Sequence, residues 1–137
     1  MSDCLFCRIV SGQIPSTKVY EDDRFLGFMD INPVTRGHCL LIPKDHHENL
    51  FALPEDLLRE YIGTARRLAG VLVKGLEAKG LNLIQSNGRA ANQIIDHCHL
   101  HLIPRYAADE IPLAAWEMRP GDPQEIGAAA EAVRKAF

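Results

Sequence analysis

The chain has 137 residues, of which 47% are hydrophobic and 24% are charged, and its formal net charge is −3. This length and composition are typical of one globular domain with a single core, and we expect residues 1–137 to form it. A negative net charge argues against general binding to nucleic-acid backbones. No run approaches the roughly 20 apolar residues of a membrane helix, and the start is unlike a secretory signal. We therefore expect a cytoplasmic protein that binds neither nucleic acid nor a membrane.

Residues 4–12 are predicted to form a short knuckle that contains the pair Cys4 and Cys7. A Cys-x-x-Cys pair can be a redox couple, half of a zinc site, or two unrelated thiols. A thioredoxin-type couple follows a strand of a βαβ unit, which is not predicted here, so zinc is the favoured interpretation. Tetrahedral zinc needs two further ligands. The available nitrogens are those of His46 or His47 and of one histidine in residues 97–101.

Three short runs of β-branched, aromatic and aliphatic residues follow, over residues 18–21, 25–29 and 38–43. Turn-forming residues separate them, which predicts antiparallel neighbouring strands. Cys39 in the third run and Cys98 further along the chain lie in apolar surroundings, and both are predicted to be core residues.

A long helix is predicted between Pro54 and Lys79. Its apolar residues recur at intervals of three and four, which is the stripe of one helix face. Proline fits the first helical position, and Gly80 fits the stop just past the end. We expect this helix to pack across a sheet.

Two further strands are predicted over residues 81–86 and 97–104, with Asn87-Gly88 as a turn after the first. Residues 122–125 combine a capping aspartate, a proline at the first helical position and a glutamate at the third. This pattern predicts a helix running toward Phe137. The predicted fold class is α+β, an antiparallel sheet with one long helix and a C-terminal helix on one side.

The last predicted strand carries three histidines that alternate with apolar residues: His97, His99 and His101. Because strand side chains alternate between faces, the three imidazoles should project to one side, and the other side can face the core. A chance cluster is disfavoured, since adjacent imidazoles make protonation costly and add nothing to packing. The spacing alone does not separate a zinc site from nucleophilic chemistry.

The loop before this strand, residues 86–96, is polar and turn-forming. It can present backbone N–H groups and the Gln93 side chain to an anion. Taken alone, its Asn-Gly turn predicts only a hairpin connection.

Together these features resemble the histidine triad (HIT) family of nucleotide hydrolases and transferases. The resemblance extends over nearly the whole chain, and its motifs occur in the family's order, which is more specific than the triad alone. The motifs are Cys4-Leu5-Phe6-Cys7, Gly12-Gln13-Ile14-Pro15, Phe28-Met29-Asp30-Ile31-Asn32-Pro33, Gly37-His38-Cys39-Leu40-Leu41-Ile42-Pro43-Lys44, Ser86-Asn87-Gly88 and His97-Cys98-His99-Leu100-His101-Leu102-Ile103.

The resemblance implies a catalytic role for the middle histidine. His99 would attack the α-phosphorus of a bound nucleotide and form a nucleotidyl-histidine intermediate, which requires a neutral ring with one nitrogen free. His38 would lie near His99 and help to set its tautomer. His101 and Gln93 would hold phosphate oxygens, while backbone N–H groups stabilise the charge that builds on phosphorus.

The resemblance also implies a nucleotide-binding slot. Asp30 matches the family's ribose-binding carboxylate, and Phe28 and Ile31 would form part of the slot around the base. Asn87 would lie near the phosphates. Without the motif, Asp30 would be taken for a turn residue and Phe28 for a core aromatic.

Family members with the cysteine pair imply a structural zinc site. Its ligands would be Cys4, Cys7, His46 and His97, with His47 as the substitute for His46. Such a closed site would hold the knuckle on the sheet and orient the first triad histidine. The lone pair of that histidine is then not available for acid–base chemistry, so the leaving group would be protonated by His101, by water or by the substrate.

Two positions depart from the family pattern, Asn92 where glycine is usual and Ile94 where Ser or Thr is frequent. Asparagine tolerates a positive φ, so the loop can keep its shape, whereas the missing hydroxyl removes one possible hydrogen bond to the leaving group or phosphate. The base preference stays open. So does the leaving group, an amine in nucleoside phosphoramidates or a nucleotide in dinucleoside polyphosphates.

The family resemblance further implies a homodimer, to which the long helix and Trp116 in the segment from Leu113 to Met118 would contribute. Two other functions stay open. One is a nucleotide-binding sensor or scaffold without turnover. The other is a metal-dependent hydrolase with all three triad histidines on one ion, whose activity would be lost on chelation and restored by added metal.

Overall fold

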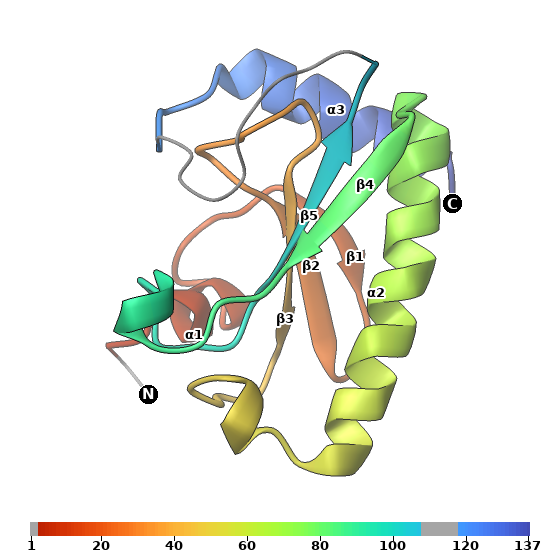
Figure 1. Ribbon diagram of the computed structural model, residues 1–137. Coiled ribbons are helices and arrows are strands. Elements are labelled where there is room, and N and C mark those ends of the chain that lie inside the picture. Colours follow the sequence, from red (N-terminus) through yellow and green to blue (C-terminus); the bar gives the residue numbers. More distant parts are fainter. Residues whose placement is uncertain (1–2, 108–117) are drawn as a thin grey trace.

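The computed structural model describes residues 3–107 and 118–137 (Figure 1). Within these residues, one antiparallel sheet has the strand order β1-β2-β3-β5-β4. Its strands in chain order are β1 (Lys18–Glu21), β2 (Phe25–Met29), β3 (Cys39–Pro43), β4 (Gly80–Ile84) and β5 (Leu100–Arg105). The helices are α1 (Leu5–Val10), α2 (Glu55–Leu76) and α3 (Pro123–Lys135), with short 3-10 turns at Leu50–Ala52 and Arg89–Ala91. The α+β class predicted from the sequence is confirmed.

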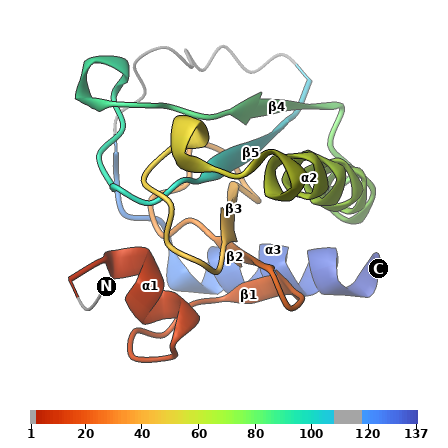
Figure 2. The same cartoon turned by 90° about the horizontal axis from the view of Figure 1, so that it is seen from below.

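The sheet has an apolar cluster on each face. Alternate residues of β2 and β3 belong to different clusters, so the clusters lie on opposite faces of these strands. The larger cluster packs α2 and α3 against one face, as predicted. The smaller one packs Phe6 and Ile9 of α1 against the other face, so helices cover both sides and not one side as predicted. Figure 2 shows α1 and α2 on opposite sides of β2 and β3.

The triad strand begins later than predicted. Its ladder with β3 and β4 runs from Leu100, and His97 and His99 precede it. The reason is that the Cys98 N–H donates to the carbonyl of His47, 2.7 Å away in the loop after β3, and not to a neighbouring strand. The side chains of this segment still alternate between two faces, because Cys98 and Leu100 are buried in the larger cluster, under α2. Cys39 is also buried, so both cysteines predicted as core residues are core residues.

The long helix is shorter at both ends than predicted. Pro54 is its N-cap, with φ −59° and ψ 146°, and not its first helical residue. The helix ends at Leu76, and Glu77 takes the left-handed conformation with φ 55°. Gly80 instead opens β4, because the chain turns directly into the sheet, where the Lys79 N–H donates to Arg105 O at 2.8 Å.

The C-terminal helix begins as predicted. The Asp122 carboxylate accepts from the Gln124 N–H at 3.0 Å, and Pro123 follows the cap. The predicted interface residue Trp116 lies outside the described residues, as does most of the segment from Leu113 to Met118. None of the helices in the described ranges is both long and apolar enough to cross a membrane.

Two glycines of α2 should respond in opposite ways to alanine. A Cβ on Gly75 would lie 2.7 Å from Ala132 O and 2.9 Å from the Ala136 Cβ, at the crossing with α3, whereas a Cβ on Gly70 meets nothing within 4 Å. We expect Gly75→Ala to lower the free energy of unfolding by about 1–3 kcal/mol through overpacking. Gly70→Ala should raise it by about 0.5–1 kcal/mol through helix propensity. Urea unfolding of both variants measures this, and stabilisation by Gly75→Ala would contradict the close helix crossing.

Candidate active site

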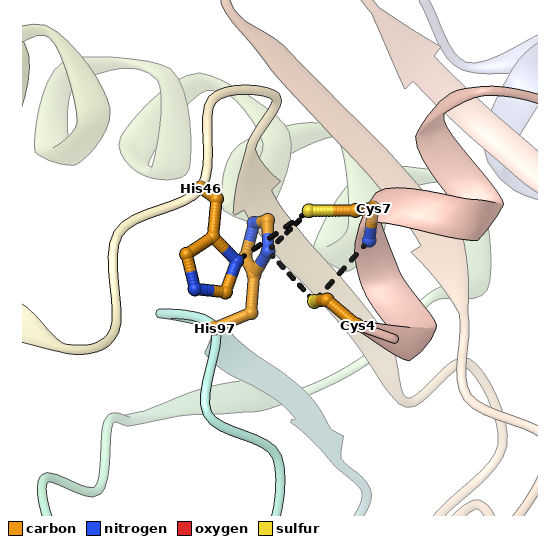
Figure 3. Close-up of side chains that lie close together, drawn as sticks. All are labelled: Cys4, Cys7, His46 and His97. Carbon is orange, nitrogen blue, oxygen red and sulfur yellow. Dashed lines mark hydrogen bonds between the residues drawn. The ribbon is translucent and has the colours of Figure 1, made fainter. Parts of the chain in front are cut away.

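Four side chains from three parts of the chain meet beside α1 (Figure 3). The Nδ1 atom of His97 lies 3.3 Å from Cys4 Sγ and 3.6 Å from Cys7 Sγ. The Nδ1 atom of His46 lies 3.4 Å from Cys7 Sγ. The four potential ligand atoms all lie within 4.8 Å of one another. This is the set that the resemblance implied, and the substitute His47 is not part of it.

The spacing of these atoms fits a tetrahedral zinc ion. Zinc bonds of about 2.3 Å to sulfur and about 2.0–2.1 Å to nitrogen place ligand sulfur and nitrogen roughly 3.6 Å apart in a tetrahedron. The His97 Nε2–H donates to the Pro43 carbonyl at 2.8 Å, so the lone pair of a neutral ring is on Nδ1 and faces the thiols. Burial, aided by the neighbouring Cys4, raises the pKa of Cys7 to about 11, and a metal must displace that proton. The cluster can hold a metal ion.

The local structure of α1 holds the cysteine pair in place. Cys4 is the N-cap, and its sulfur accepts from the Cys7 N–H at 3.4 Å. Phe6, between the two cysteines, is only 5% exposed, and Ile9 is buried one turn later. The helix is therefore docked by its apolar face with both thiols directed toward His97.

The middle triad histidine is buried and oriented by the backbone. His99 is 5% exposed, and its Nδ1 lies 2.7 Å from the carbonyl oxygen of His97. Because a carbonyl only accepts, Nδ1 carries the proton and the lone pair of the neutral ring is on Nε2. Burial lowers the pKa of His99, partly offset by the His97 carbonyl and by Asp30. The ring is therefore neutral at physiological pH, as a nucleophile requires.

The third triad histidine belongs to a hydrogen-bonded chain. His38 Nδ1 accepts from the Val34 N–H at 3.0 Å, so the His38 proton is on Nε2, which lies 3.0 Å from His101 Nδ1. His38 therefore donates to His101, whose own proton is on Nε2. Burial lowers the pKa of His38 to about 4 and that of His101 to about 3, with neighbouring histidines adding to the second shift. His38 was predicted to set the tautomer of His99, but it sets that of His101.

Asp30 lies beside this chain at the end of β2. One carboxylate oxygen accepts from the Asn32 N–H at 2.8 Å, and the other lies 3.5 Å from His38 Nε2. Burial raises the pKa of Asp30. Asp30, His38 and His101 are close enough to be considered as metal ligands. However, the proton on His38 Nε2 occupies the position that a metal would need, so the geometry favours a hydrogen-bond chain.

The two residues predicted around the base differ in exposure. Phe28 is 4% exposed, and its ring lies 5.7 Å from that of Phe6 in an edge-on contact. Ile31 is 73% exposed. The ring of Phe6, a residue for which the sequence predicted no role, also lies 5.1 Å from the His99 ring. The signal that could have identified it is its place between the two cysteines.

The prediction that Gln93 holds phosphate oxygens does not fit the structure. The side chain is buried, its Oε1 accepts from the Gly88 N–H at 2.7 Å, and its Nε2 donates to Glu48 O at 2.6 Å and Ile95 O at 2.9 Å. Both amide protons and the carbonyl are therefore used within the protein. Gln93 closes the loop before the triad and ties it to the loop that carries His46.

Asn87, in the same loop, also uses its side-chain amide within the protein. Asn87 Oδ1 accepts from the Leu50 N–H at 2.8 Å, and its Nδ2 donates to Gln85 Oε1 at 2.6 Å, so its amide also joins the two loops. Asn92 has a left-handed φ of 68°, as expected where the family usually has glycine. Ile94 is 54% exposed.

The three triad histidines do not converge on one ion. Among the described residues, His97 gathers with the cysteines and His46, whereas His101 gathers with His38 and Asp30. His99 belongs to neither group. This separation disfavours the alternative in which one metal bound by the whole triad performs hydrolysis.

Replacing Gln93 should destabilise the fold. In Gln93→Met, the Gly88 N–H and the carbonyls of Glu48 and Ile95 lose their partners, so we expect the free energy of unfolding to fall by about 2–4 kcal/mol. Ile94→Ala, at the exposed neighbouring position, is the control and should cost less than about 0.5–1 kcal/mol. Urea unfolding measures both, and equal small losses would show that Gln93 does not hold the loops together.

Known proteins resemble this chain over most of its length. Residues 11–108 match the HIT domain family. Protein hit of Bacillus subtilis is 41% identical over 120 residues, covering 88% of this chain and 83% of that protein. Adenosine 5'-monophosphoramidase HNT1 of Candida albicans is 40% identical over 108 residues, covering 76% of this chain and 71% of that protein.

One solved structure with this fold is of a zinc-bound protein. The Zn-bound histidine triad family protein from Mycobacterium smegmatis is 37% identical, with a TM-score of 0.88 over 98% of this chain and 93% of that one. The family match over most of the chain, the relatives and the shared fold lead to one conclusion: this chain belongs to the HIT domain family.

Proposed function

We propose that this protein is a nucleotide hydrolase that acts on the α-phosphate of its substrate through a covalent nucleotidyl-histidine intermediate on His99. The observation that carries the proposal is the 2.7 Å hydrogen bond from His99 Nδ1 to the His97 carbonyl. It directs the lone pair of a buried, neutral ring to Nε2, which is the state that a nitrogen nucleophile needs.

The reaction divides into two displacements at phosphorus. First, the Nε2 lone pair of His99 forms a bond to the α-phosphorus, and the bond from phosphorus to the leaving group breaks. The leaving group takes up a proton as it departs. Water then attacks the same phosphorus and gives up a proton to solvent, the bond to Nε2 breaks with its electron pair returning to the ring, and the nucleoside monophosphate is released. In both steps the Nδ1–H remains bonded to the His97 carbonyl, which stabilises the positive charge on the substituted ring.

Other residues bind and orient the nucleotide in this proposal. Asp30, partly exposed at the end of β2, accepts from the ribose hydroxyls, and Phe28 and Ile31 flank the base. His101 donates its Nε2–H to a phosphate oxygen, because His38 has fixed the proton on that nitrogen. Gln93 and Asn87 are left out of phosphate binding, since their amides bond within the protein.

Nucleoside phosphoramidates are the favoured substrate class. The relative from Candida albicans carries the name adenosine 5'-monophosphoramidase, and it aligns with 76% of this chain. The leaving group would then be an amine, which His101, water or the substrate itself protonates. Dinucleoside polyphosphates, with a nucleotide as leaving group, are the competing class.

We further propose that Cys4, Cys7, His46 and His97 bind one structural zinc ion. The support is the two-sulfur, two-nitrogen donor set, its near-tetrahedral spacing and the zinc-bound relative from Mycobacterium smegmatis. When bound, zinc would neutralise the thiolates and join α1 to the sheet. All four tetrahedral positions are then filled by protein, so the ion takes no part in the displacements.

Replacing the nucleophile should abolish turnover while leaving the fold intact. We expect His99→Ala to lose at least about a thousandfold in kcat/KM for nucleoside phosphoramidates, because the variant lacks the lone pair that attacks phosphorus in the proposed mechanism. His47→Gln, a histidine outside both sites, is the control and should retain activity. Brief reaction with α-³²P-labelled substrate followed by denaturation should leave label on wild type and none on His99→Ala.

The same measurements separate the competing functions. A panel of phosphoramidates and dinucleoside polyphosphates ranks the two substrate classes by kcat/KM. Equal rates for wild type and His99→Ala would remove the proposed mechanism. Tight nucleotide binding without turnover of either class would instead identify a sensor or scaffold.

Zinc should be present in the purified protein at one ion per chain. Cys4→Ser removes one of two sulfur ligands, so we expect lower zinc content and a melting temperature lower by several degrees, since metal binding contributes to folding. Elemental analysis and thermal unfolding measure these effects. Substoichiometric zinc in fresh wild-type protein, together with an unchanged melting temperature of the variant, would contradict the proposed site.

A further inference from the structure

Phe6 lies between the proposed metal ligands, Cys4, Cys7, His46 and His97, and the proposed nucleophile His99. It sits on α1 between Cys4 and Cys7, and its ring lies 5.8 Å from the His97 ring and 5.1 Å from the His99 ring. Both contacts are edge-on, with interplanar angles of 79° and 80°. A third edge-on contact, at 5.7 Å, joins Phe6 to Phe28 in the proposed base slot. One side chain of α1 thus touches a metal ligand, the nucleophile and the nucleotide slot.

His97 provides a second connection between the two centres. Its Nδ1 faces the cysteines, and its carbonyl oxygen accepts from His99 Nδ1. A metal that fixes the His97 side chain therefore also fixes the carbonyl that orients the nucleophile.

The attachment of α1 depends on contacts with the rest of the fold. The helix has six residues, too few to be stable on its own, so it relies on tertiary contacts. Those contacts include the burial of Phe6 and Ile9, the packing of Val10 beside them, and the approach of both cysteines to His46 and His97. A metal ion bound by the cysteines would replace weak thiol–imidazole contacts with coordination bonds. Because Phe6 lies on α1 between the two cysteines, these bonds would also restrict the position of its ring.

We propose that metal binding and nucleotide binding are positively coupled, and that Phe6 is the positioning residue that transmits the coupling from α1 to His99 and Phe28. The inference rests on the proposed nucleotide site. Because coupling free energies are reciprocal, zinc must tighten nucleotide binding and the nucleotide must tighten zinc binding by the same factor. Phe6 itself takes no part in chemistry.

The test measures the coupling in both directions with AMP. AMP affinity is determined by calorimetry for zinc-loaded and chelator-treated protein, and zinc affinity is determined by competition with a chromophoric chelator, with and without AMP. We expect zinc to lower the Kd of AMP by at least about fivefold, and AMP to lower the Kd of zinc by the same factor. The competition measurement gives the factor even where the metal-free protein is poorly folded.

Two variants assign the coupling to Phe6. Phe6→Leu keeps all four metal ligands and most of the apolar volume but loses the ring contacts, so its coupling factor should fall toward one while it still binds zinc. Ile9→Val is the matched control, since it trims a buried residue of the same helix and the same apolar cluster and should keep the wild-type factor.

The outcomes are distinguishable. Equal AMP affinity with and without zinc in the wild type would overturn the inference and leave the proposed function intact. Full coupling in Phe6→Leu would overturn the role of Phe6. A protein that binds AMP in neither state would instead refute the proposed nucleotide site.

Discussion

The hydrogen bond between the His99 ring and the His97 carbonyl is the interaction on which the site depends. It determines which nitrogen of His99 has the lone pair, and no side chain is needed to do so. The same residue that supplies the carbonyl directs its own ring toward Cys4 and Cys7. Alternation along the chain makes this possible, because residues two apart lie on one face while the intervening Cys98 enters the core.

Burial keeps the imidazoles of this face neutral. The pKa values of His38, His97, His99 and His101 are all lowered, with burial as the largest cause in each. Neutral rings need defined tautomers, and backbone groups provide them. Val34 donates to His38, His97 donates to the Pro43 carbonyl, and His99 donates to the His97 carbonyl. The backbone thus decides which nitrogen of His38, His97 and His99 is an acceptor, and the His38 side chain decides it for His101.

Features that depend on local pattern could be predicted from the sequence. The short strands, the long amphipathic helix and the Asp122 cap follow from periodicity and from the preferences of single residues, and each was found within a few positions. The grouping of Cys4, Cys7, His46 and His97 came from family resemblance, since spacing alone left His46 and His47 equivalent. The structure separates these two because the ring of His46 reaches Cys7.

Features that depend on distant partners could not be predicted. The Gln93 amide is consumed by carbonyls that include Glu48, 45 positions away, so its burial has no local signal. The late start of β5 likewise follows from the bond between Cys98 and the His47 carbonyl. The place of Phe6 between the two cysteines is visible in the sequence, but only the meeting of α1 with the triad shows its contacts with two histidines.

The sequence separation of the four proposed metal ligands limits when during folding they can come together. Cys4 and His97 are 93 positions apart, and Cys7 and His46 are 39 positions apart. Contacts of such long range form only after the entropy of closing the intervening loops has been overcome. A nascent chain whose triad has not yet been synthesised lacks His97, one of the four ligands. Complete coordination of a metal ion would therefore be a late event in maturation, and a filled site would mark a chain in which Cys4 and Cys7 have already met His97.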